Sequence, residues 1–208
     1  MRSTSRLRGF AAIVLCCLVA ACQDKVPPPA ADTPAQVPAA KPMPEASLPD
    51  SQWVLHGLDQ GERRYSELSQ INRDTLGELG LAWHFNMYTR RGVEATPLMV
   101  DGTLYVTGSW SMVYALDARN GELKWFHDPR VDRSFLARGC CDAVNRGVAY
   151  HDGRLFLGTY DGRLLALNAE DGSVIWDVQT TDREQSYTIT SAPRIVEDRV
   201  VIGNGGAE

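Results

Sequence analysis

The chain repeats itself, and this repeat restricts its fold more than any other feature of the sequence. Residues 97–125 and 148–176 align without a gap at an offset of 51 positions and share eight identities over 29 positions. A third copy begins at "APRIVEDRVVIGNGG" (192–206), and "LGELGLAW" (76–83) is similar to the end of an earlier copy. A fixed period of this length is typical of proteins built from similar stacked units.

Each copy has the pattern of short antiparallel strands. Apolar residues alternate with polar ones, and Asp-Gly or Asn-Gly pairs, which favour tight hairpin turns, separate the runs. A tryptophan closes each unit, at Trp83, Trp125 and Trp176, where we expect it to serve packing. The pattern predicts an all-β chain that forms blades of a β-propeller. A β-sandwich would not explain a gapless repeat that ends on a tryptophan.

The N-terminal residues predict export from the cytoplasm. Three arginines within the first eight residues precede an apolar run over residues 10–21, which is the layout of a signal peptide and too short for a stable transmembrane helix. The small residues of "LVAAC" then precede Cys22, as in the bacterial lipobox, whose cysteine carries a lipid. We therefore expect residues 1–21 to be a lipoprotein-type signal, Cys22 to be lipidated, and the protein to be anchored at a bacterial membrane in the periplasm. An ordinary cleaved signal is the alternative.

The composition changes after the signal. Residues 22–50 hold eight of the chain's eleven prolines among alanines and few large apolar residues. Such a segment forms an extended tether and no core, so the folded body is expected over residues 51–208. Without residues 1–21 the chain has 18 Lys and Arg against 26 Asp and Glu, a net charge of −8. An acidic chain without a basic patch argues against nucleic-acid binding.

Cys140 and Cys141 are adjacent in the sequence. Neighbouring Cα atoms lie about 3.8 Å apart, whereas ordinary disulfides span roughly 4.4–6.8 Å, so a bond between these two would close a small, strained ring. Two buried thiols and a metal-binding pair are the alternatives. Cys16 and Cys17 would leave with the signal and Cys22 would carry lipid, so an oxidising compartment favours the bond without excluding either alternative.

The segments that interrupt the repeat resemble one enzyme family. The units that end in "LDARNGELKW" and "LNAEDGSVIW" are similar to the tryptophan-docking repeats of quinoprotein propellers, which bind pyrroloquinoline quinone (PQQ). "RRGVEATPL", "ARGCCDAVNRG" and "TITSAP…IGNGGAE" resemble, in this order, cofactor-site segments of the PQQ-dependent alcohol dehydrogenases, in particular the ethanol type. The resemblance is continuous over about residues 51–208 and implies the N-terminal part of an eight-bladed propeller.

This resemblance assigns cofactor contacts to individual residues. It implies that Glu94 is a hydrogen-bonding group at the edge of the quinone. It also implies that Cys140 and Cys141 form a disulfide ring that packs against one face of the planar cofactor. Arg146 would lie beside the quinone oxygens and carboxylates, which suits its permanent planar charge. Thr190 would meet the cofactor through its hydroxyl group.

The end of the chain completes the implied site. Gly205, Gly206 and Ala207 would let the backbone approach a flat ligand closely. Glu208 matches the family's metal ligand, and carboxylates suit Ca²⁺, which takes roughly six to eight oxygen ligands. The acidic residue that separates calcium from lanthanide enzymes lies further downstream in that family, so both metals stay open.

The activity implied by the resemblance is the oxidation of a small primary alcohol to an aldehyde. In the family a metal polarises the quinone carbonyl, a carboxylate base removes the alcohol proton, and a cytochrome c accepts the electrons. The aspartate base is expected beyond residue 208, so this chain alone is not expected to turn over substrate. Similar repeats also occur in a cofactor-free lipoprotein scaffold of outer-membrane protein assembly, which is the alternative. The set that distinguishes the two is Glu94, Cys140, Cys141, Arg146 and Glu208, because a scaffold has no use for it.

Overall fold

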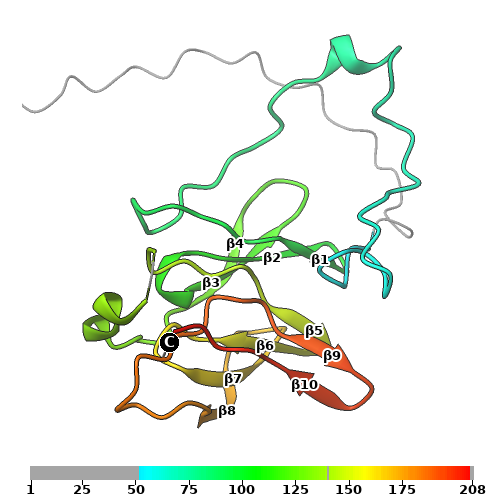
Figure 1. The fold of residues 1–208 in the computed structure, drawn as a ribbon. Coiled ribbons are helices and arrows are strands. Elements are labelled where there is room, and N and C mark those ends of the chain that lie inside the picture. The colour runs from blue at the N-terminus through cyan, green and yellow to red at the C-terminus, as the bar shows by residue number, and fades with distance from the viewer. Residues whose placement is uncertain (1–51, 140, 207–208) are drawn as a thin grey trace, which may run out of the picture. The chain divides into compact units, whose positions relative to one another are not determined.

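The computed structural model describes residues 52–139 and 141–206, whose regular structure is mainly antiparallel sheet (Figure 1). The first sheet contains, in spatial order, β1 (Leu98–Val100), β2 (Thr103–Thr107), β3 (Val113–Asp117) and β4 (Leu123–His127). The second contains β5 (Ala149–His151), β6 (Arg154–Gly158), β7 (Arg163–Asn168) and β8 (Val174–Gln179). A hairpin of β9 (Arg194–Val196) and β10 (Arg199–Val201) follows, and β9 contacts β5. Each four-stranded meander has the form of a propeller blade, so the predicted all-β architecture is confirmed.

The described residues also contain three short 3₁₀ helices, one before β1, one between β2 and β3, and one between β4 and β5. They are η1 (Leu76–Glu78), η2 (Ser109–Ser111) and η3 (Arg133–Arg138). Within the part of the chain that the structure describes, no helix is long and apolar enough to cross a bilayer. The predicted signal (1–21), the lipidation site Cys22 and the tether (22–50) lie outside the described residues.

The two blades repeat each other in detail. The β1–β2 and β5–β6 hairpins turn at Asp101–Gly102 and Asp152–Gly153, and all four turn residues have positive φ, as a tight primed turn requires. The register of the third strand with the fourth shifts between Ala115 and Leu116 in one blade and at the equivalent place in the other. The 51-residue period of the sequence is therefore also the period of the structure.

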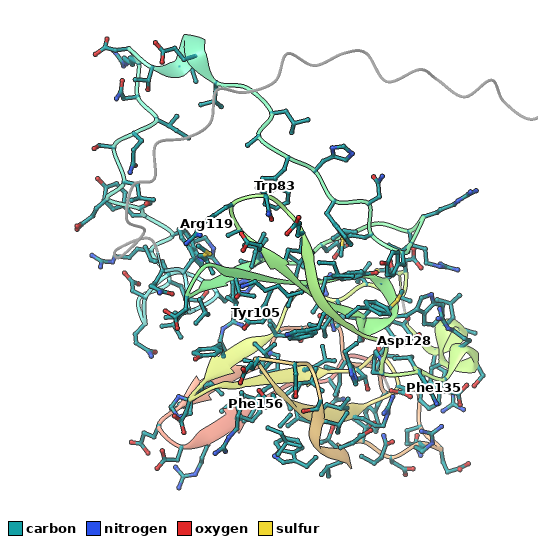
Figure 2. All side chains as sticks on the ribbon, turned by 180° about the vertical axis from the view of Figure 1, so that it is seen from behind. Trp83, Tyr105, Arg119, Asp128, Phe135 and Phe156 are labelled. Carbon is teal, nitrogen blue, oxygen red and sulfur yellow. The ribbon has the colours of Figure 1, made fainter. Side chains whose placement is uncertain are left out.

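A shared apolar core joins the two blades. It contains side chains from both sheets, among them Leu98, Val113, Val148, Leu155, Leu165 and Leu167. The Tyr105 hydroxyl crosses this interface and donates to the carbonyl oxygen of Ala169 (2.9 Å), which also accepts from Nε1 of Trp125 (3.0 Å). Figure 2 shows Tyr105 between the two sheets. Because strand residues alternate in direction, one face of each blade enters this core and the strand ends remain available for loops.

Candidate functional site

A pocket of about 720 Å³ lies where the inter-blade connection meets the ends of the second and third repeats. Its walls come from the end of η3 and the described part of the connection to β5 (residues 138, 139 and 141–146), from Tyr160 at the β6–β7 turn, from residues 185–190, and from Gly205 with Gly206. All four stretches are loops or strand ends that the sheets hold in place. Binding sites are often built on such loops, because a rigid scaffold holds the loops in place while their side chains stay free to contact a ligand.

Arg146 contacts two of the other predicted site residues, Glu94 and Thr190. Its Nη2 atom forms an ion pair with Oε2 of Glu94 (2.9 Å), and its Nη1 donates to Oγ1 of Thr190 (2.7 Å). The backbone N–H of Arg146 donates to the carbonyl oxygen of Thr190 (2.9 Å), and the Arg146 carbonyl accepts from Thr96 N (3.2 Å). The Arg146 and Glu94 side chains are each 45% exposed, so both can still reach a ligand.

Gly206 allows the closest backbone approach at the pocket. Thr188 and Gly205 are paired by two backbone hydrogen bonds (3.0 and 2.8 Å), which fix the segment across the pocket wall. Gly206 has a φ of 92°, and a Cβ atom there would lie 2.0 Å from the carbonyl oxygen of Ser186. Only glycine fits this position. The predicted glycines thus lie on the same pocket as Arg146 and Thr190.

Cys141 lines the pocket beside Asp142, which forms an ion pair with Arg91. Cys140, Ala207 and the predicted metal ligand Glu208 lie outside the described residues, so the predicted Cys140–Cys141 disulfide stays a prediction. Among residues 52–139 and 141–206, no group of three or more His, Cys, Asp or Glu side chains is arranged to hold a metal ion.

Two residues at the pocket had no role assigned to them from the sequence, although Arg138 lies within the segment "ARGCCDAVNRG". The Arg138 guanidinium lies 4.1 Å from the centroid of the Phe135 ring and donates to the carbonyl oxygens of Arg183 and Gln185. Tyr160 passes so close to Gly139 that a Cβ on that glycine would lie 1.9 Å from the hydroxyl oxygen. The hydrogen bonds of Arg138 and the contact of Tyr160 join residues far apart in the sequence, so only the fold brings them together.

The charges of the pocket favour an anionic ligand. Arg138 and Arg146 line it, and Arg146 is paired with Glu94; Asp142, the one carboxylate that lines it among the described residues, is paired with Arg91, so the charge of Arg138 remains in excess. Arginine provides planar donors that match carboxylates and quinone oxygens. A second hollow beside His56 has a volume of about 50 Å³, which is too small for an organic cofactor.

Comparisons with known protein families and sequences agree with this picture. The family model described as the β-propeller domain of PQQ-dependent glucose, ethanol and other alcohol dehydrogenases matches residues 53–208. The quinohemoprotein alcohol dehydrogenase ADH-IIG of Pseudomonas putida is 51% identical over 86% of this chain and 25% of its own length. A 1-butanol dehydrogenase (cytochrome c) of Thauera butanivorans is 51% identical over 76% of this chain and 23% of its own length. The chain therefore spans about a quarter of the length of the curated relatives it matches.

Solved structures of this enzyme family also match the chain. The quinohemoprotein alcohol dehydrogenase of Comamonas testosteroni is 50% identical, with a TM-score of 0.72 over 74% of this chain and 23% of its own. A europium-containing methanol dehydrogenase is 40% identical, with a TM-score of 0.71 over 74% of this chain and 27% of its own. BamB of Moraxella catarrhalis is 17% identical, with a TM-score of 0.50 over 59% of this chain and 37% of its own, a likeness of fold alone.

Proposed function

Because the chain belongs to the family of PQQ-dependent alcohol dehydrogenases, as its motifs predicted, we propose that the whole protein oxidises a small primary alcohol to an aldehyde with PQQ as its cofactor. The observation that carries this proposal is the Arg146 cluster. Its guanidinium is held between Glu94 and Thr190 at the edge of a pocket large enough for an organic cofactor. Glu94 and Arg146 do not belong to the apolar core clusters of either blade, so core packing does not explain their ion pair.

The residues of the pocket fit a flat tricarboxylate such as PQQ. Arg146 would bind its oxygens, with Glu94 and Thr190 fixing the direction of the guanidinium. The Gly205–Gly206 backbone leaves room for a planar ring, and Cys141, with Cys140 in a disulfide, would cover one face of it. Bound PQQ would supply the two-electron redox chemistry, which protein side chains cannot provide.

We propose that Glu208 contributes to a Ca²⁺ or lanthanide site beside the cofactor, where a hard cation would act as a Lewis acid. The matched part of this chain covers only 25% and 23% of two of these relatives, and the aspartate base and the other metal ligands are proposed to lie in the rest of the protein. A cytochrome c is the proposed electron acceptor, since one relative is named as a dehydrogenase that uses it.

The proposed location follows from the N-terminal sequence. A signal over residues 1–21, a lipid on Cys22 and a proline-rich tether over residues 22–50 would hold the folded body at a membrane in the periplasm. A cofactor-free scaffold is the less well supported of the two candidate functions, because BamB shares only 17% sequence identity with this chain. The scaffold function also leaves the Arg146 cluster without a purpose.

The test uses the whole protein, produced with its export signal and reconstituted with PQQ and Ca²⁺. We expect ethanol-dependent reduction of an artificial dye that requires both additions. Arg146→Ala and the double variant Cys140→Ala, Cys141→Ala should lose most of this activity, while Arg199→Ala, an arginine with a 79% exposed side chain in β10, should not. A whole protein that binds no PQQ would disprove the dehydrogenase function.

A further inference from the structure

One turn of the first blade has a left-handed backbone at two residues that are not glycine. Trp110 and Ser111, in η2 between β2 and β3, have φ values of 62° and 58°. The equivalent turn of the second blade, 51 positions later, has Gly162 in the place of Ser111, with a φ of 81°. Left-handed backbone is unfavourable for residues with a Cβ atom and persists where surrounding contacts hold it, often at functional sites. The first blade therefore keeps a strained serine at the position where the second blade has a glycine.

Ser111 provides a hydroxyl group that a glycine could not. Its side chain is fully buried, and its Oγ accepts hydrogen bonds from the backbone N–H of Tyr160 (3.1 Å) and from Nδ2 of Asn145 (3.3 Å). Tyr160 lines the cofactor pocket, and Asn145 directly precedes Arg146. The turn of one blade is thus tied to two other loops that form the pocket.

Asn145 transmits this support to Arg146. The Asn145 side chain is 1% exposed; its Nδ2 also donates to the Gly158 carbonyl oxygen (2.8 Å), and its Oδ1 accepts from the N–H of Gly147 (3.0 Å). The backbone N–H of Trp110 donates to the carbonyl oxygen of Ala143 (2.8 Å). These bonds hold the backbone on both sides of Arg146, and the low dielectric of a buried site strengthens them.

We propose that Ser111 and Asn145 are positioning residues of the cofactor pocket: they hold the loop 143–147 so that the Arg146 guanidinium lies between Glu94 and Thr190. This inference rests on the proposed function, because the ligand of Arg146 is taken to be PQQ. It also explains why this turn keeps a serine, since a glycine at position 111 would offer no hydroxyl group to Tyr160 and Asn145. Neither residue touches the ligand itself.

The first test needs no cofactor. Amide hydrogen exchange is measured on the whole protein in the absence of PQQ, and the wild type is compared with the variants Ser111→Gly and Asn145→Ala. We expect the amides of Arg146 and Gly147 to exchange at least about tenfold faster in both variants. The matched control is Tyr105→Phe, which removes a buried hydrogen bond between the blades, and its exchange in the 143–147 loop should stay at the wild-type rate. Unchanged protection of the loop in Ser111→Gly and Asn145→Ala would overturn the proposal.

The second test measures the dissociation constant for PQQ together with the melting temperature. Ser111→Gly relieves the left-handed strain, so it should melt within a few degrees of the wild type yet bind PQQ about tenfold more weakly. In an Arg146→Lys background the same change should have little further effect, because Ser111 acts through Arg146. Wild-type affinity in Ser111→Gly, or full additivity with Arg146→Lys, would overturn the proposal. If the wild-type protein binds no PQQ, the proposed function is wrong, and the exchange comparison alone decides the role of Ser111.

Discussion

The indole ring of Trp83 lies directly against Gly121: a Cβ atom on that glycine would be 2.4 Å from the ring carbon Cε3. Nε1 of the same ring donates to the carbonyl oxygen of Ala118 (3.1 Å), and Figure 2 shows Trp83 next to the first sheet. Trp125 has the same relationship with Gly172 in the next blade, at 2.6 Å. Each tryptophan thus packs on the glycine turn of the blade that follows it, which is the packing role predicted from the repeat.

This docking predicts unequal costs for four Gly→Ala substitutions that share a positive φ. Gly121 and Gly172 contact an indole ring, whereas a methyl group on Gly102 or Gly153 would meet no described residue within 4 Å other than its chain neighbours. The left-handed conformation alone costs a residue with a Cβ about 1–2 kcal/mol. Gly102→Ala and Gly153→Ala should lose about that much, and Gly121→Ala and Gly172→Ala at least about 2 kcal/mol more. Chemical denaturation measures the difference, and four equal losses would contradict the docking role.

A buried ion pair should be essential for the second blade. The Arg163 side chain is 17% exposed and that of its partner Asp161 3%, and Asp161 also accepts from Thr159 Oγ1 (2.6 Å) and the backbone N–H of Asp132 (3.1 Å). Arg163→Met leaves a buried carboxylate without its cation, which should cost about 3–5 kcal/mol of unfolding free energy. Adding Asp161→Asn should restore part of the loss. Arg199→Met, at an exposed pair, is the control and should stay within about 0.5 kcal/mol of the wild type.

His127 should make stability depend on pH. Burial lowers the pKa of this β4 histidine below its ordinary value of 6.5, and its Nε2 atom has no hydrogen-bond partner among the described residues. The unfolded chain therefore binds the proton first, so stability is full above pH 6.5 and falls as the pH drops below it. In His127→Val, which carries the type of residue found at the equivalent position of β8, the decline between pH 7 and 5 should be shallower. The exposed His151→Val is the control; an unchanged slope in His127→Val would refute the prediction.

Gly206 should affect cofactor binding more than stability. A methyl group there would collide with the Ser186 carbonyl oxygen, so Gly206→Ala must move one wall of the pocket. We expect the affinity of the whole protein for PQQ to fall at least about tenfold, while the melting temperature changes by only a few degrees. Gly203→Ala, at a glycine with open space around it, serves as the control in the same binding titration. Equal affinities in the two variants would show that the Gly205–Gly206 wall does not contact the cofactor.

The sequence alone was sufficient to predict the blades, because their signals are local. Strand alternation, the Asp101–Gly102 and Asp152–Gly153 turns and the spacing of the tryptophans each depend on a few neighbouring residues. The family was also readable, since its motifs are short and contiguous. The segments that hold Glu94, Arg146 and Thr190 could therefore be named before any contact between them was known.

Only the tertiary structure decided how those segments meet. Arg146 lies 52 positions from Glu94 and 44 from Thr190, and Ser111 lies 34 positions from the Asn145 side chain that it binds. No local preference encodes such pairs, because hydrogen bonds between loops exist only after two blades have packed and set the distance between their ends. Ser111 even contradicts the local preference for glycine at a left-handed position, which the second blade follows at Gly162. The sequence determined the blades and the family; packing determined which side chains form the pocket and which residues hold them there.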